Sequence, residues 1–287
     1  MKRFTTMLIA VLLSAAMWGQ VQLTTRSFKF NDFMEKTTKV VLTGNLFYDS
    51  ILKEEIANRW RLSPYEFCTA EEFETLKTDS EFYFLVTTKG QFKKEAAPGI
   101  TFLSLVKGGP DAKKGIRYML EVVSIPLCPS ENPDGREFLF LPAFVDILQI
   151  HTELAMQYDF NAYVGLAGST KYMAENISPE QRLLIAETDL SKSISDLFRK
   201  DFMKRIELTD EETIDKAMME GTPDVLVSYV VTPTDPVYGT YCYKMIINPE
   251  NKTLFWYKRS RISKYAEPGF LEGDLRRVQE LLKAKRK

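Results

Sequence analysis

The chain repeats one order of predicted elements twice, and this repetition constrains its fold more than any other feature. The first copy begins with a β-branched strand and an amphipathic helix. Its elements are, in order, a strand at 39–43, a helix at 46–60, a strand at 65–67, a helix from Thr69 to Leu76 and a strand at 81–87. Thr69 and Glu72 have the spacing of a capping box, which predicts where the second helix begins.

The same order returns at an offset of about 143 residues. The second copy consists of a strand at 182–186, a helix at 193–202, a strand at 205–208, a helix after Thr209 that ends near Met219, and a strand at 223–232. Thr209 again precedes a glutamate, Glu212, by three residues. This agreement in order and length favours duplication over chance recurrence within one α/β domain.

Each copy then continues with a predicted hairpin and a closing helix. The hairpin strands are 100–106 with 116–125, and 241–247 with 253–259, joined by segments rich in Gly, Pro, Asn and Asp. Pro142 and Pro268 each precede a Phe-aliphatic-acid pattern, so we expect a helix to begin at each proline. We therefore predict an α/β protein with a tandem duplication of a β-α-β-α-β-β-β-α module that contains a mixed sheet. The predicted modules are residues 20–160 and 161–287, joined between 158 and 178.

Residues 1–19 match a secretory signal peptide. A positive start at Lys2 and Arg3 precedes an apolar run, Met7–Ala16, that is shorter than the roughly 20 residues of a bilayer-spanning helix. Cleavage after Ala16 or after Gly19 fits the small residues that follow. We expect an exported protein, periplasmic or extracellular, with no membrane span after signal cleavage.

Composition excludes several classes of function. The chain has 38 Lys and Arg against 39 Asp and Glu, so it lacks the excess of basic residues that is typical of nucleic-acid-binding proteins. A single histidine rules out a multi-histidine metal site in one chain, and three cysteines without a C-x-x-C pair predict neither a zinc knuckle nor a redox centre. We expect no cofactor.

The residues whose side chains could act in catalysis or metal binding are better explained by structural roles. His151 lies on the apolar stripe of its predicted helix, which favours a packed histidine with one hydrogen-bond partner over a general base. Cys68, Cys128 and Cys242 are expected to be buried free thiols. Ser104 and Lys107 match S-x-x-K, but in a strand these positions point to opposite faces, so we attribute the match to chance.

The strongest candidate for partner contact is aromatic. Large rings crowd the second predicted hairpin, where strand alternation places some of them on an outward or inter-module face. The candidate partner-binding residues are Tyr238, Tyr241, Tyr243, Phe255, Trp256 and Tyr257. The alternative is that these rings are core residues packed against helices.

Several short segments and the element order of the modules resemble known proteins. A signal peptide ending in Gly-Gln, then 52–60, Pro64-Tyr65-Glu66-Phe67 and Glu71-Glu72-Phe73, is similar to uncharacterised secreted proteins of the Bacteroidota. Asp49-Ser50-Ile51 resembles that group's O-glycosylation pattern, and its alternative role is helix capping. The element order of each module resembles the small α/β domain that precedes the propeller in the Tol-system propeller protein, and this resemblance implies protein contacts in the envelope.

These observations favour a non-enzymatic binding or adaptor protein of the cell envelope, whose partner is an envelope protein or a surface component. One alternative is a periplasmic small-ligand binding protein with a cleft between two lobes, in which strands usually cross between the lobes. The other is a glycan or cell-wall hydrolase that uses a pair of carboxylates.

Overall fold

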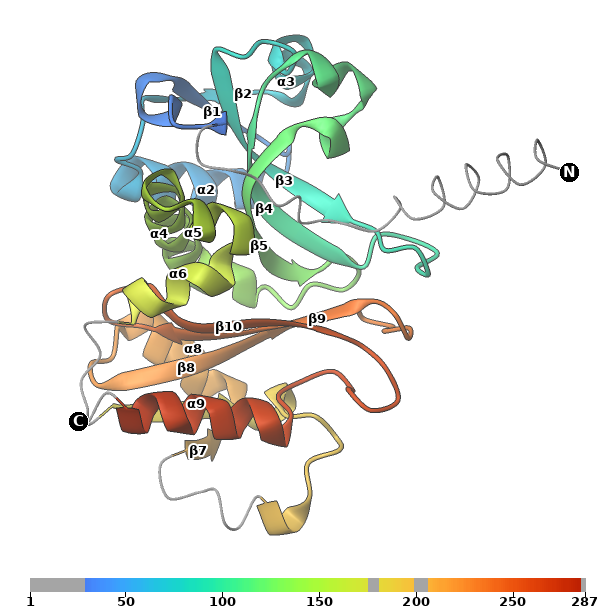
Figure 1. The fold of residues 1–287 in the computed structure, drawn as a ribbon, viewed down its shortest axis with the longest axis vertical. Coiled ribbons are helices and arrows are strands. Elements are labelled where there is room, and N and C mark those ends of the chain that lie inside the picture. Colours follow the sequence, from blue (N-terminus) through green and yellow to red (C-terminus); the bar gives the residue numbers. More distant parts are fainter. Residues whose placement is uncertain (1–28, 175–180, 199–205, 285–287) are drawn as a thin grey trace, which may run out of the picture.

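The computed structural model describes residues 29–174, 181–198 and 206–284 (Figure 1). The predicted signal peptide lies outside the described residues, as do parts of the predicted inter-module join and of the predicted helix at 193–202. Within the described part, residues 196–198 of that helix are helical.

Two five-stranded mixed sheets with one topology form the molecule. The first contains β1 (Thr37–Val41), β2 (Tyr65–Cys68), β3 (Phe82–Gly90), β4 (Ile100–Lys107) and β5 (Leu120–Pro129), in the order β2-β1-β3-β4-β5. The second contains β6 (Arg182–Ala186), β7 (Ile206–Thr209), β8 (Val225–Val231), β9 (Tyr241–Asn248) and β10 (Thr253–Arg261), in the order β7-β6-β8-β9-β10. In each sheet the first three strands are parallel and the last two add antiparallel. The structure thus has the predicted fold class, and the matching sheets indicate a duplicated module.

Helices follow the strands in the same order in both modules. The first module has α2 (Leu46–Arg59), α3 (Ala70–Leu76) and α4 (Arg136–Gln157), and the second has α8 (Glu211–Glu220) and α9 (Glu272–Ala284). Two short helices, α5 (Asp159–Val164) and α6 (Leu166–Met173), lie between the modules. Four 3₁₀ turns complete the described elements: η2 (Phe33–Glu35), η3 (Pro110–Lys114), η4 (Ile116–Tyr118) and η5 (Glu187–Asp189).

Several predicted boundaries were wrong. The α4 helix begins at Arg136 after Gly135, whose positive φ of 87° ends the preceding loop, and Pro142 lies inside the helix. A proline there removes one helical hydrogen bond, and the burial of the flanking apolar residues offsets that loss. The α9 helix likewise begins at Glu272, four residues after Pro268.

The two predicted caps had different outcomes. Thr69 and Glu72 form the complete capping box of α3, as predicted. In α8 the cap is Asp210, whose carboxylate accepts the Thr213 N–H at 2.8 Å, so the predicted capping role of Thr209 was wrong. Aspartate caps a helix as well as threonine does, and adjacent candidates differ only by a one-residue shift of the helix start.

The helices cover the two sheets on different faces. In the first sheet, Val40, Leu85 and Leu103 pack under α2 and α4, while the opposite face packs under α3, η3 and η4. In the second sheet, one face packs under α9. The other face packs under α8 and against the first module, so residues of both modules form one continuous core.

The α4 helix occupies the space between the sheets (Figure 1). Among the described residues it is the one helix long and apolar enough, by length and composition, to cross a membrane. Here its apolar side chains are buried against β5 of the first module and against β10 and α8 of the second. Its composition is therefore explained by contacts on two sides within the protein.

Candidate functional site

The six aromatic residues predicted to bind a partner lie in three different environments. Tyr243 and Tyr257 are buried on the face of the second sheet that meets the first module. Phe255 and Trp256 are buried under α9, where Trp256 stacks on Phe270 at 5.7 Å. Tyr241 is half-buried, and Tyr238 is 61% exposed. Of the six, only Tyr238 presents most of its ring to solvent.

The buried tyrosines of the second sheet join the two modules. The Tyr229 hydroxyl donates a hydrogen bond of 2.5 Å to the carbonyl oxygen of Leu127, on the edge strand β5 of the first sheet. The centre of the Tyr229 ring lies 4.3 Å from the ring centre of Phe140 and 5.5 Å from that of Phe144, both on α4. The ring of Tyr243 packs edge-on against that of Phe102 on β4, with the ring centres 5.5 Å apart. Aromatic burial on the second sheet therefore serves contact within the chain.

A buried arginine adds charge to the same junction. Arg136, the first residue of α4, is 8% exposed, and its Nε donates to the Asp215 carboxylate on α8 at 2.8 Å. Its Nη1 lies 3.5 Å from Glu211, and its guanidinium lies 5.5 Å from the Tyr229 ring centre. Because both carboxylates belong to the second module, Arg136 fixes the orientation of α8 against α4.

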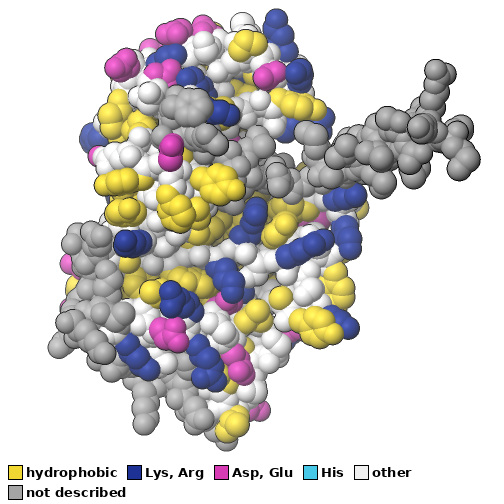
Figure 2. Space-filling model, viewed as in Figure 1, with side chains coloured by type: hydrophobic (Ala, Val, Ile, Leu, Met, Phe, Trp, Pro, Cys, Tyr) yellow, Lys and Arg dark blue, Asp and Glu magenta, His cyan; other side chains and the backbone are white. Residues whose placement is uncertain are grey.

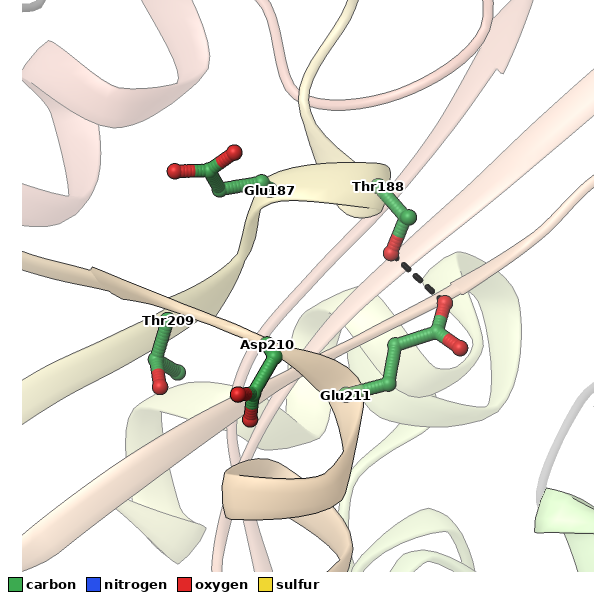
Figure 3. Close-up of a pocket in the computed structure, with 5 residues that line it drawn as sticks. All are labelled: Glu187, Thr188, Thr209, Asp210 and Glu211. Atoms are coloured by element: carbon green, nitrogen blue, oxygen red, sulfur yellow. Dashed lines mark hydrogen bonds between the residues drawn. The ribbon is translucent and has the colours of Figure 1, made fainter.

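An acidic hollow lies at the carboxyl ends of β6 and β7 (Figure 3). Ligands of open α/β sheets bind beyond the carboxyl ends of the strands, and this hollow lies at such an edge, although the switch point of the β7-β6-β8 order falls between β6 and β8. The hollow has a volume of about 290 Å³ and is lined by Glu187, Thr188, Thr209, Asp210 and Glu211.

The carboxylates of this hollow already have partners or point away from each other. Thr188 donates to Glu211 at 2.6 Å, and Asp210 caps α8. Figure 3 shows the Glu187 carboxylate pointing away from Thr188 and Glu211. No group of three potential metal ligands occurs within the described ranges. The hollow is explained by helix capping and module contact.

His151 has the structural role that the sequence predicted. It is fully buried, and its Nδ1 lies 2.7 Å from the Ser169 hydroxyl on α6. Burial lowers the pKa of His151 to about 4, so the ring is neutral at physiological pH. It ties α4 to α6 and offers no accessible base.

The cysteines and the S-x-x-K match are also structural. All three cysteines are buried and free, as predicted. Burial raises the pKa of Cys68 to about 11 and that of Cys128 to about 12, which leaves neither as a ready nucleophile. Ser104 bonds to Ser124 at 2.8 Å, while Lys107 pairs with Asp32. The predicted separation of Ser104 from Lys107 is confirmed.

Exposed charge and aromatic surface gather instead where loops of both modules meet. We define the junction surface as Lys89, Lys93 and Lys94 of the β3–β4 hairpin, Tyr238 of the β8–β9 loop, and Arg261, Lys264 and Tyr265 at and after the end of β10. Figure 1 shows these loops projecting on one side of the molecule, and Figure 2 shows Lys and Arg side chains on that side. Tyr265 is 83% exposed.

Gly239 is the point at which these loops touch. Its φ of +105° favours glycine, and a β-carbon there would lie 3.0 Å from Lys94 Cδ and 3.4 Å from Arg261 Nη2. The Gly239 N–H bonds to the Ile262 carbonyl at 2.9 Å, which holds the next turn alongside. A cation of the first module and a cation of the second are thus placed side by side.

A second exposed aromatic surface lies on the helices between the modules. Phe160 and Tyr163 of α5 are 67% and 61% exposed, and Tyr158 stacks on Tyr172 at 5.4 Å. We call Tyr158, Phe160 and Tyr163 the α5 patch. It belongs to the linker alone, whereas the junction surface requires both modules.

No family model matches the sequence, and the comparisons with curated proteins and with solved structures found no match. The sequence predicted Tyr238 as a candidate but not its neighbours Lys94, Arg261 and Tyr265, because these residues are far apart along the chain. The only local signals were Gly239 in a turn and the lysines of 89–94.

Proposed function

We propose that the protein is a non-enzymatic binding or adaptor protein of the cell envelope, which holds its partner on the junction surface. Export to the periplasm or beyond is part of this proposal and is supported by the signal-like pattern of residues 1–19. The observation that carries the proposal is the meeting of exposed tyrosines and cations from both modules around Gly239.

Three residues of this surface, Tyr238, Arg261 and Tyr265, are of the types that binding interfaces favour. Tyrosine and arginine are enriched at binding interfaces, because each combines a large contact area with hydrogen-bonding groups. The chain buries most aromatic residues of its second hairpin, yet Tyr238 and Tyr265 remain at loop tips beside Arg261 and Lys264. Lys264 lies 4.6 Å from the Tyr265 ring centre, which orients both side chains together.

The rival ligand-binding hypothesis predicts strands that cross between the lobes. The described strands β1–β5 form one sheet and β6–β10 form the other, so the strands pass between sheets once. The space between the sheets is filled by α4 and by the tyrosines of the second sheet. These features favour an outer binding surface over an inter-lobe cleft.

Site-specific photo-crosslinking in living cells tests the proposal. A photoreactive amino acid replaces Tyr265 in one strain, Tyr163 of the α5 patch in a second, and Tyr118 of η4 in a third. We expect one defined adduct from position 265, and its loss when Lys94→Glu and Arg261→Glu are added. An adduct at 163 with none at 265, or no effect of the two charge reversals, would contradict the proposal.

A further inference from the structure

The charge of the junction surface is uncompensated. Among the described residues, no carboxylate forms an ion pair with any of its five cations, although lysines elsewhere, such as Lys36, Lys39 and Lys258, are paired. The cations are Lys89, Lys93, Lys94, Arg261 and Lys264, all exposed. A chain with a formal net charge of -1 therefore concentrates unpaired positive charge on one set of loops.

The acidic residues on these loops are fewer than the five cations, so they offset only part of that charge. The Glu95 carboxylate turns back to accept the Phe92 N–H at 2.7 Å, inside the β3–β4 loop. Asp235 and Glu267 lie on the same β8–β9 and β10–α9 loops, and within the described residues neither is ion-paired with a cation. The surface should attract anions in solution.

The exposed tyrosines at the loop tips indicate which kind of anion this surface binds. Tyr265 and Tyr238 project beside the cations from neighbouring turns rather than lining an enclosed cradle. Tyrosine is enriched where membranes meet water, since its ring enters the headgroup layer while its hydroxyl remains hydrated. Cations beside it then contact lipid phosphates.

We propose that the junction surface binds the phosphate-bearing face of an anionic phospholipid membrane. This inference rests on the proposed function and names its partner. Lys94 and Arg261, side by side at Gly239, contact the headgroup phosphates, and Tyr238 and Tyr265 enter the headgroup layer. Both modules contribute, so the bound surface requires the native arrangement of the two sheets.

Vesicle co-sedimentation tests this assignment. The full chain, expressed with its own N-terminal segment, is mixed with phosphatidylglycerol vesicles or with phosphatidylcholine vesicles over a range of salt concentrations. We expect binding to phosphatidylglycerol that weakens with salt, and much weaker binding to phosphatidylcholine. The proposed function includes export, so the protein is purified after export, and the difference between the two lipids is the readout.

A matched pair of variants locates the effect. Lys94→Glu with Arg261→Glu should weaken binding to phosphatidylglycerol by roughly 25-fold or more, at about fivefold for each cation lost. Lys192→Glu with Lys216→Glu, at exposed positions outside the junction surface, changes net charge equally and should leave binding unchanged. Tyr265→Ser should weaken binding to vesicles without altering its salt dependence.

Four results would overturn the inference: equal binding to both lipids, equal losses in the two double variants, displacement by inorganic phosphate at millimolar concentration, or tighter binding to a soluble polyanion such as heparin. Displacement by phosphate would identify a site for a free anion, and preference for heparin would identify a polymer. If vesicles fail while the crosslink at position 265 persists and depends on Lys94 and Arg261, the proposed function stands and the lipid assignment fails. If both fail, the junction surface is not the binding site.

Discussion

The two modules share one topology but differ in what covers their closing helix. In the first module α4 is buried on two sides, by its own sheet and by the second module. In the second module α9 packs Leu275, Val278 and Leu282 on its own sheet and buries Asp274, and its other positions described up to 283 are exposed or half-buried. Corresponding helices thus have different compositions because one is internal and the other terminal.

The contact between the modules is head-to-tail. The α2–α4 face of the first module meets the α8 face of the second, and these are not corresponding faces. Such a contact could in principle repeat. The first module covers its own α3 face with η3 and η4, and the second presents the polar side of α9. The stack is therefore capped at both ends, as repeat arrays are.

The first prediction compares α4 with α9 directly. Phe144→Ala removes a ring that contacts both modules and should lower the free energy of unfolding by about 4 kcal/mol. Leu275→Ala, on α9, should cost roughly 2.5 kcal/mol, since solvent lies beyond that helix. Urea unfolding measures both. An equal or larger loss from Leu275→Ala would contradict the internal role of α4.

The second prediction concerns a buried ion cluster found under α9. The Lys244 ammonium is fully buried and bonds to Asp274 at 2.5 Å, and Lys258 pairs with the same carboxylate. Asp274→Asn would leave Lys244 buried beside a neutral group and should cost about 3 kcal/mol. Asp111→Asn, at an exposed pair with Lys114, is the control and should leave the urea midpoint unchanged.

Acid should reveal the same cluster. Burial raises the pKa of Asp274, but the hydrogen bonds from Lys244 and Lys258 outweigh this and hold its pKa below the ordinary 3.8. The stability that this ionised carboxylate contributes is full above pH 3.8 and is lost as pH falls through the lowered pKa. The free energy of unfolding should therefore fall less between pH 4 and pH 2 in Asp274→Asn than in the parent protein. An unchanged acid profile would show that Asp274 is not ionised in the folded protein.

The third prediction concerns the pH dependence of stability that arises from Glu121, on β5. Burial raises the pKa of Glu121, on β5, from 4.5 to about 8, although Ser124 and Arg259 lower it in part. Because the unfolded chain loses this proton near pH 4.5, stability falls as pH rises from 4.5 to 8. Glu121→Gln should stabilise the protein by about 2 kcal/mol at pH 9, which is less than half of the roughly 5 kcal/mol of the full shift because the side chain is partly exposed, and should have no effect at pH 4. A constant difference between parent and variant over this range would contradict the assignment.

The fourth prediction removes one hydroxyl from the contact between the modules. Tyr229→Phe leaves the Leu127 carbonyl without its donor and should cost about 1 kcal/mol. Tyr238→Phe, at an exposed ring, should cost nothing measurable. Thermal or urea unfolding distinguishes the two, and equal effects would show that the Tyr229–Leu127 bond contributes no stability.

Local patterns predicted the fold, while contacts between distant segments decided the site. The strand 182–186 was predicted with its observed bounds, because its apolar run is short and continuous. The α5 and α6 helices were missed, because Gly165 and Gly168 indicated a loop in the predicted join. The packing of α6 on β10 and of α5 on α4 overrides that local preference.

The candidate aromatics illustrate the limit of strand alternation. Alternation separates two faces of a strand but does not reveal that a second module covers one of them. An irregularity between Leu254 and Trp256 also shifts the register, and Phe255 and Trp256 fall in the same cluster under α9. The junction surface depends on which three loops meet at Gly239, and no local pattern contains that information.

Hydrogen exchange as a function of urea tests most directly whether the two modules form one unit through α4. We predict that the slowest amides of β4 in the first sheet and β9 in the second exchange with one common free energy. Phe144→Ala should lower both values by the same amount. Two different free energies, with only the first sheet affected by Phe144→Ala, would contradict the shared core and the function proposed at its junction.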